Sequence, residues 1–265
     1  MSDSLNPYEL RRQIQSPANI FAPLGQRVCR AYSGWNRGPI EWNKVSVKHR
    51  EKFERLLELW ESNPESITII NGDAVCFKNE FAIGSGSYGT EVYICLGFDG
   101  IERAIKRLPK QMCEKFLKNE RDILNSRNAV ESPRIVNYFF YDDTSNPDFG
   151  YLILNLYEQN LEEFIKEKGE RMTESDDRNM IRQVLEGLKA LHAREPRILH
   201  RDLKPTNILV DVYGNLLLSD FGIGRFFPEQ ELKGNLLACR SLSPWHASLP
   251  TSEGIKQFSA DLVGK

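Results

Sequence analysis

The chain has 265 residues, of which 40% are hydrophobic and 27% are charged, and its formal net charge is -2. These values are typical of globular proteins and exclude an intrinsically disordered chain. The near-neutral charge gives no basic field for nucleic acid or an anionic membrane, so neither is expected as a partner.

The sequence predicts a cytoplasmic protein. Residues 1–7 lack the basic start and apolar centre of a secretory signal, and no apolar run is long enough to form a membrane segment. The five cysteines are odd in number and include no Cys-x-x-Cys pair, which favours reduced thiols.

Residues 1–67 are predicted to form an N-terminal extension. Residues 1–46 contain four prolines and no sustained periodicity, which indicates irregular or disordered structure. Within them, Trp35 and Trp42 either dock onto a partner or the main domain, or are ordinary loop aromatics.

An amphipathic helix is predicted over residues 47–61. Its apolar side chains share one helical face: Phe53, Leu56, Leu57 and Trp60. We expect this face to pack on the domain that follows.

A hairpin and a glycine-rich loop come next. Apolar runs at 68–70 and 75–77 flank Asn71-Gly72, a strong turn signal. The loop that follows contains three spaced glycines: Gly84, Gly86 and Gly89.

The segment after the glycines decides what kind of loop this is. In a dinucleotide-binding site, spaced glycines lead from a strand into a helix. Here residues 91–95 are β-branched and aromatic, so the glycines lead into another strand. Because glycine allows close backbone approach, the loop is a candidate phosphate cradle.

A third strand is predicted over residues 101–108 and carries Lys106, followed by a helix over 114–127. Glu120 falls on the apolar face of that helix, where an unpaired charge is costly. Lys106 is therefore its expected partner. Glu114 is a weaker candidate, because helical spacing turns it away from that face.

The next elements are predicted as strands over 132–141 and 151–156, and helices over 161–168 and 174–193. The longer helix is expected to turn its apolar residues inward: Ile181, Val184, Leu185, Leu188 and Leu191.

Residues 198–210 and 218–222 contain most of the candidate catalytic residues of the chain. Two short apolar runs, 208–210 and 216–218, read as buried strands that border polar loops. The sequence around them is Ile-Leu-His-Arg-Asp-Leu-Lys-Pro-Thr-Asn-Ile-Leu-Val, followed by Leu-Ser-Asp-Phe-Gly. Polar groups on loops held by rigid strands are a common setting for catalysis.

These blocks, with the glycine loop and Ala104-Ile-Lys106 before them, resemble the catalytic motifs of eukaryotic protein kinases. The resemblance covers about residues 74–263. It implies an α+β, bilobal fold, with a kinase N-lobe of antiparallel sheet at 68–157 and a helical C-lobe at 158–265.

The resemblance also implies phosphoryl transfer from ATP to a protein hydroxyl. Lys106 would hold the α- and β-phosphates and be fixed by Glu120. Asp202 would accept or orient the substrate proton, and Lys204, typical of serine/threonine kinases, would neutralise the γ-phosphate.

Two further sets of residues follow from the same resemblance. Mg²⁺, which prefers oxygen ligands, would be held by Asn207 and Asp220. Leu154 would stand at the gatekeeper position beside the adenine. The remaining nucleotide contacts would come from Ile83, Gly84, Gly86, Gly89, Val92, Ala104, Asn155, Tyr157 and Leu209.

Residues beyond Gly222 resemble an activation segment that departs from the family pattern. Trp245 and its neighbours stand where kinases carry Ala-Pro-Glu, and the proline and glutamate are missing. Phosphate on Ser241 or Ser243 would pair with Arg201 and Arg225 and order the loop. The alternative is that these serines only populate a flexible loop.

Within the kinases, residues 104–109, 135–139 and 161–165 resemble the inositol-requiring kinase/endoribonuclease of the unfolded protein response and its relative ribonuclease L. Because residues 259–263 resemble the start of a helix that anchors the catalytic loop, we expect the C-lobe to be truncated and weakly catalytic.

Three functions are therefore expected alternatives. The first is an active serine/threonine kinase with a protein substrate. The second is a nucleotide-dependent scaffold or pseudokinase that forms a homodimer or binds partners without turnover. The third is a fragment of a larger kinase/endoribonuclease.

Overall fold

The computed structural model describes residues 42–113 and 115–227, which belong to a unit that begins at Ile40. The expectations for Trp35, Glu114, the serines of the activation-like segment and the helix start at 259–263 fall outside the described residues. The division at residues 67 and 157 stays a prediction.

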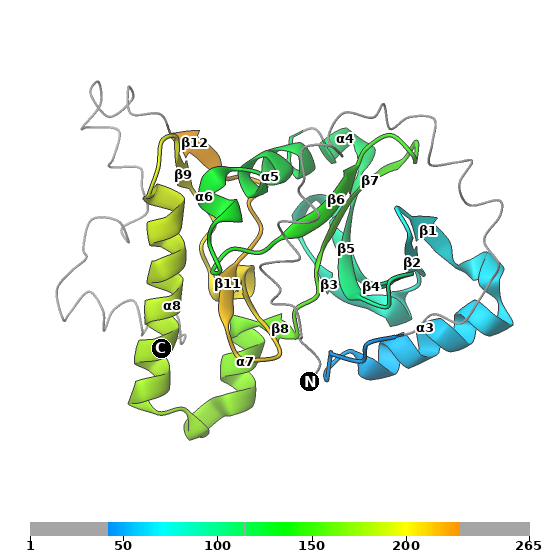
Figure 1. Cartoon of the computed structure of the whole chain (residues 1–265), viewed down its shortest axis with the longest axis horizontal. Coiled ribbons are helices and arrows are strands. Elements are labelled where there is room, and N and C mark those ends of the chain that lie inside the picture. Colours follow the sequence, from blue (N-terminus) through cyan, green and yellow to red (C-terminus); the bar gives the residue numbers. More distant parts are fainter. Residues whose placement is uncertain (1–41, 114, 228–265) are drawn as a thin grey trace, which may run out of the picture. The chain divides into compact units, whose positions relative to one another are not determined.

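The described residues form a seven-stranded antiparallel sheet in the order β1-β2-β4-β5-β7-β6, with β3 paired to β4 (Figure 1). Its strands are β1 (Thr68–Ile70), β2 (Asp73–Val75), β3 (Ala82–Ser85), β4 (Glu91–Gly97), β5 (Glu102–Pro109), β6 (Tyr138–Asp142) and β7 (Phe149–Asn155).

Two smaller sheets lie in the second half of the described chain. One has the order β11-β10-β8 and the other pairs β12 with β9. Their strands are β8 (Gln159–Asn160), β9 (Arg197–Leu199), β10 (Ile208–Val210), β11 (Leu216–Leu218) and β12 (Arg225–Phe227).

Helices accompany both groups of strands (Figure 1). The α-helices are α3 (Arg50–Ser62), α4 (Lys110–Cys113), α5 (Leu117–Leu124), α6 (Arg127–Val130), α7 (Leu161–Lys168) and α8 (Glu174–His192). Short 3-10 turns are η3 (Pro64–Ser66), η4 (Asn79–Phe81), η5 (Ser87–Gly89), η6 (Gly169–Arg171) and η7 (Pro205–Asn207). Across this part of the chain, none of the helices is both long and apolar enough to cross a bilayer.

The predicted hairpin is present, although its second strand begins earlier than expected, at Asp73. Asn71 and Gly72 both adopt positive φ, of 51° and 86°. This is the conformation that a two-residue turn requires for strands with a right-handed twist, and Asn-Gly tolerates it best.

Two hydrophobic cores support the elements. In the first, Phe53 and Leu56 of α3 are almost fully buried with side chains of the sheet such as Ile94 and Ile105. This confirms the docking face of the N-terminal helix. The second core joins α5 and α8 to β10 and β11, and it encloses Phe221 completely.

The helix predicted over residues 114–127 is wrong in its extent. The structure has α5, whose C-cap is Asn125, and then the separate short helix α6. Ser126 divides them, because its backbone is extended and its hydroxyl accepts a hydrogen bond from the Ala129 amide at 3.3 Å. The strand predicted from residue 132 also begins later, at Tyr138.

The inward face predicted for α8 is wrong at Leu185, which is 36% exposed. Val184 and Leu191 are buried as expected, and Gln183 and Gly187 complete the buried stripe. Gln183 is held inward because its side-chain oxygen accepts a hydrogen bond from the Leu216 amide at 2.9 Å.

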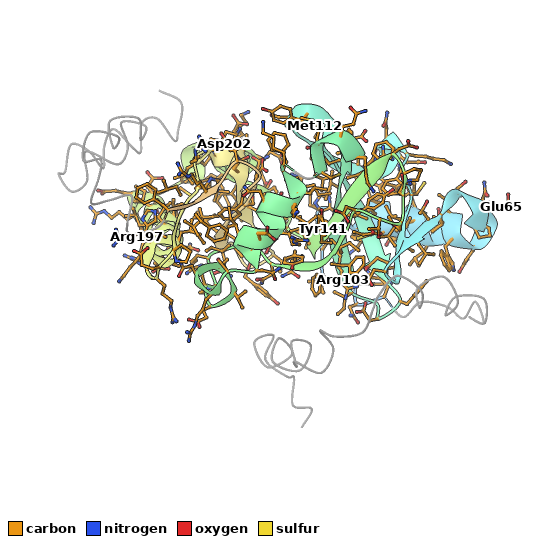
Figure 2. The ribbon with its side chains drawn as sticks, turned by 90° about the horizontal axis from the view of Figure 1, so that it is seen from above. Glu65, Arg103, Met112, Tyr141, Arg197 and Asp202 are labelled. Atoms are coloured by element: carbon orange, nitrogen blue, oxygen red, sulfur yellow. The ribbon has the colours of Figure 1, made fainter. Side chains whose placement is uncertain are left out.

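The α+β fold class is confirmed, with a sheet-rich half and a half that carries α7 and α8. Side chains fill both halves in Figure 2, where Asp202 lies in the same half as Arg197, and Glu65 lies at the far end of the other half.

Candidate active site

Lys106, Glu120 and Asp220 meet in one ion-pair cluster. Lys106 Nζ lies 2.6 Å from Glu120 Oε2 and 2.9 Å from Asp220 Oδ1. The three side chains come from β5, α5 and the loop after β11. The expected pair of Lys106 with Glu120 is present, and Asp220 is an additional partner.

Burial and charge act in opposite directions on this cluster. Burial raises the pKa of Glu120, whose side chain is only 2% exposed. Burial would also raise the pKa of Asp220, but the Lys106 ammonium holds it below its ordinary value. Burial would lower the pKa of Lys106, but Glu120 and Asp220 together raise it. Lys106 therefore remains a fixed positive charge.

A second polar group forms around Asp202. Lys204 Nζ donates to Asp202 Oδ2 at 2.9 Å, and Asn207 Nδ2 donates to the same oxygen at 2.9 Å. Asn207 Nδ2 also donates to the backbone carbonyl of Asp202 at 2.8 Å. These bonds fix the carboxylate on the loop that precedes β10.

Asn207 also connects this group to the segment that carries Asp220. The backbone amide and the hydroxyl of Ser219 both donate to the Asn207 carbonyl, each at 2.9 Å. Asp220 follows immediately, so the hairpin of β10 and β11 brings the predicted metal ligands onto adjoining segments.

His200 holds the same loop through hydrogen bonds of its ring. Its Nε2 lies 2.9 Å from the Ser219 carbonyl, and the Asp202 amide donates to its Nδ1 at 3.3 Å. A carbonyl only accepts, so Nε2 carries the hydrogen and the ring is neutral. Burial lowers the pKa of His200 below 6.5, which favours this neutral form.

The His200 contacts predict a loss of stability in mild acid. A histidine whose pKa is lower in the folded state contributes stability that is complete above 6.5 and is lost as the pH falls from 6.5 through the lower pKa of the folded state. We therefore expect the free energy of unfolding to fall as the pH drops below about 6.5. Urea titration of the wild type and His200→Gln measures the difference, and an equal loss in both would refute the assignment.

Asn119 was not predicted from the sequence. Its side-chain amide donates to the carbonyls of Phe221, Gly222 and Gly224 at 3.1, 3.0 and 2.9 Å. It therefore holds the Asp-Phe-Gly segment against α5, one residue from Glu120. A signal was available, because Asn119 lies three residues after Phe116 and so on the same helical face.

Removal of the Asn119 amide should loosen the Asp-Phe-Gly segment. We expect Asn119→Ala to lower the free energy of unfolding by about 1–3 kcal/mol, the usual penalty for buried polar groups left without partners. Asn119→Asp should be worse, because it directs a carboxylate at three carbonyls. Urea unfolding measures both, with Asp122→Ala on the same helix as an exposed control; equal stability of all three would contradict the role.

The glycine loop between β3 and β4 has open space beside two of its three glycines. A Cβ added at Gly84 or Gly86 would meet its nearest neighbour at 3.7 or 3.4 Å, so internal packing leaves room for a side chain at either position. Gly89 is different, because its φ of 75° disfavours any other residue. Packing within the described residues therefore does not require glycine at the first two positions, and the backbone there is open to close approach.

Two of the predicted adenine contacts lie on the face of the sheet that carries Lys106. Val92 pairs with Lys106 across β4 and β5, and Ala104 lies two residues before Lys106, so all three share one face of the sheet. Ala104 also pairs with Leu154, the predicted gatekeeper.

The remaining predicted contacts are half-buried. Ile83 precedes Gly84 in β3, and Leu209 in β10 pairs with Asn160 of β8. Asn155 and Tyr157 stand where β7 leads toward β8.

The oxygen donors suit a hard cation such as Mg²⁺. Asn207 uses its amide nitrogen in the bonds to Asp202, which leaves its amide oxygen for a ligand, and Asp220 is an ionised, half-exposed carboxylate. Within residues 42–113 and 115–227, no three His, Cys, Asp or Glu side chains form a metal cluster. A bound Mg²⁺ would therefore also need phosphate and water oxygens.

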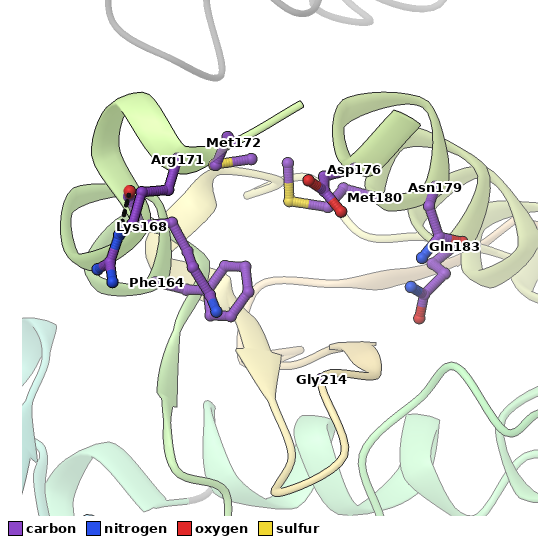
Figure 3. Close-up of a pocket in the computed structure, with 9 residues that line it drawn as sticks. All are labelled: Phe164, Lys168, Arg171, Met172, Asp176, Asn179, Met180, Gln183 and Gly214. Atoms are coloured by element: carbon purple, nitrogen blue, oxygen red, sulfur yellow. Dashed lines mark hydrogen bonds between the residues drawn. The ribbon is translucent and has the colours of Figure 1, made fainter. Parts of the chain in front are cut away.

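A separate cavity of 260 Å³ lies between α7, η6, α8 and the turn at Gly214 (Figure 3). Its lining includes Phe164, Lys168 and Asp176. It shares no residue with the candidate active site.

Comparison with known proteins finds relatives among the serine/threonine-protein kinases. A probable serine/threonine-protein kinase MRK1 homolog of Encephalitozoon cuniculi is 35% identical over 150 residues, which are 56% of this chain and 45% of that protein. The serine/threonine-protein kinase/endoribonuclease ire-1 of Caenorhabditis elegans is 32% identical over 158 residues, 57% of this chain and 16% of that protein.

The serine/threonine-protein kinase/endoribonuclease IRE2 of Homo sapiens is 28% identical over 255 residues, 94% of this chain and 25% of that protein. The chain thus spans less than half the length of each of these three relatives. The protein kinase domain model matches residues 77–245, more than half of the 265 residues. The chain therefore belongs to the protein kinase family.

Proposed function

We propose that the chain is a serine/threonine protein kinase that transfers the γ-phosphate of ATP, with Mg²⁺, to a hydroxyl group of a protein substrate. The observation that carries the proposal is the position of Lys106, 2.6 Å from Glu120 and 2.9 Å from Asp220. One cation thereby joins the nucleotide-facing strand, α5 and the Asp-Phe-Gly segment.

Phosphoryl transfer needs positioned groups and compensation of charge rather than covalent chemistry by the protein. Lys106 would hold the phosphates, and Glu120 would hold Lys106. The substrate oxygen would bond to the γ-phosphorus as the bond to the bridging oxygen breaks and ADP leaves. Mg²⁺, held by Asn207 and Asp220, would supply further positive charge to the phosphates.

The Asp202 group fits the remaining tasks. Its carboxylate would accept or orient the proton that the substrate hydroxyl loses. Lys204 donates to that carboxylate in the structure and has a half-exposed side chain, so it would reach the γ-phosphate without leaving the loop. Positioned proton acceptors typically contribute about 10²–10⁴-fold to a rate.

The test compares the wild type with Asp202→Asn, in transfer of labelled γ-phosphate to protein and in binding of ATP. A kinase should lose about 10²–10⁴-fold in rate on substitution and retain nucleotide affinity. If both proteins bind ATP and neither transfers phosphate, the chain is a nucleotide-binding scaffold instead.

We further propose a role in the unfolded protein response, as part of a homodimer. Support comes from two relatives that are named kinase/endoribonucleases, one of them similar over 94% of this chain. Phosphorylation of the chain should then rise when misfolded protein is induced in cells. An unchanged level would contradict the role, and sedimentation with and without nucleotide tests the dimer.

A further inference from the structure

Residues 42–49, which we call the strap, precede α3 and contact three separate parts of the structure. These parts are β5, the connection from β7 to β8, and α7. We call residues 155–158 of that connection the hinge. The strap has no helix or strand over residues 42–46, so side-chain and backbone hydrogen bonds determine its path.

One end of the strap is attached to Glu102 in β5. Trp42 Nε1 donates to Glu102 Oε1 at 2.6 Å, and the Ser46 amide donates to Oε2 at 2.6 Å. Both oxygens of this buried carboxylate are therefore used. Because side chains alternate along a strand, Glu102 shares its face with Ala104 and Lys106.

The middle of the strap is attached to the hinge. Glu158 Oε2 accepts hydrogen bonds from the amides of Val47 and Lys48 at 3.2 and 2.7 Å. The buried ring of His49 places Nε2 3.3 Å from the Tyr157 carbonyl, which is its acceptor. The backbone expected to face adenine is thus held from the strap side.

The side chain of Lys48 attaches the strap to residues that follow the hinge. Lys48 Nζ lies 2.6 Å from Glu163 Oε2 in α7, and it donates to the Gln159 side-chain oxygen at 3.2 Å. The strap therefore connects the sheet to α7 alongside the hinge. It adds to the contacts that Lys106 and Asn119 make with the Asp-Phe-Gly segment, and it is the attachment that lies beside the covalent crossing at 155–158.

We infer that the strap braces the hinge for nucleotide binding, with Glu158 as its principal positioning residue. The inference rests on the proposed function, because it concerns the same nucleotide site. A hinge that is already ordered loses less conformational entropy when a ligand binds. Loosening the strap should therefore weaken ATP binding, while the groups that act on the γ-phosphate stay in place.

The experiment uses the full chain and measures MgATP affinity by calorimetry, together with KM and kcat. Glu158→Ala should weaken binding and raise KM for ATP by about threefold to tenfold, with little change in kcat, as expected for lost hydrogen bonds to a charged group. Glu158→Gln keeps an acceptor oxygen and should recover most of the affinity.

Glu162→Ala is the matched control, because it also removes one negative charge nearby. Glu162 pairs with Lys166 inside α7 and not with the strap. Equal affinities for Glu158→Ala, Glu162→Ala and the wild type would overturn the inference. A fall in kcat with unchanged KM would also overturn it, because the brace would then act on transfer rather than on binding.

Hydrogen exchange separates this inference from the proposed function. In Glu158→Ala, the amides of Val47, Lys48 and the hinge should exchange faster than in the wild type. If the wild type binds no ATP, the proposed function fails, and exchange alone decides whether the strap braces the hinge. Unchanged exchange in Glu158→Ala would then overturn the brace as well.

Discussion

Lys106→Met should lower phosphotransfer by roughly 10³-fold or more, the scale seen for other cations that stabilise a transferring phosphoryl group. Lys106 is the partner of two carboxylates and has a side chain only 12% exposed, so no neighbouring solvent ion replaces it easily. Initial rates of labelled phosphate transfer measure the loss. Lys110→Met, at the first residue of α4 directly after β5, is the matched control.

The same substitution should also affect folding, in a way that can be separated from catalysis. Without Lys106, the buried carboxylate of Glu120 loses its counter-ion, and breaking a buried pair costs about 3–5 kcal/mol. Lys106→Met/Glu120→Gln should therefore regain stability in urea and stay inactive. Near-normal turnover by either variant would remove Lys106 from the mechanism.

The pair of Lys106 and Glu120 was predictable because two sequence rules apply to it. Strand spacing fixes the face of Lys106, and a carboxylate on the apolar face of a helix requires a partner. The third member, Asp220, was expected only as a metal ligand. Its contact with Lys106 joins residues 114 apart in sequence and depends on a φ of 60° at Asp220, neither of which a periodic pattern encodes.

The path of the strap is a clearer case of contacts that a periodic pattern does not encode. Residues 42–46 lack periodicity, and that was correctly interpreted as irregular structure. The position of the strap nevertheless depends on hydrogen bonds from Ser46 to Glu102 and from Lys48 to Glu158, over separations of 56 and 110 residues. Trp42, for which docking and a plain loop were both open, docks on the main domain through Glu102 and also contacts Phe53 of α3.

The prediction was wrong at Leu185 and missed Asn119 for a related reason, because apolar character was used as the measure of burial. On α8, Gln183 is buried through hydrogen bonds and Leu185 is not. On α5, Asn119 is directed inward by three backbone carbonyls. Polar residues with several specific partners are the ones that hydrophobic periodicity misplaces.

Asp220→Asn should abolish the dependence of nucleotide binding on Mg²⁺. The pKa of Asp220 is lowered by Lys106, so the carboxylate is ionised at neutral pH and its charge is available to a cation. Asparagine keeps one oxygen and tolerates positive φ better than most residues, so the backbone at 60° should persist. The variant therefore removes charge without removing the local fold.

The expected rate loss for Asp220→Asn is at least about 10³-fold, because a bound metal ion contributes several kcal/mol to charge stabilisation and each 1.36 kcal/mol is about tenfold. ATP affinity with and without Mg²⁺ is the decisive measurement, with Asp122→Asn on α5 as an exposed control. Since Glu120 still pairs with Lys106, urea stability should change little. If Mg²⁺ strengthens ATP binding equally in Asp220→Asn and the wild type, the cation is held elsewhere, and Asp220 serves only to position Lys106.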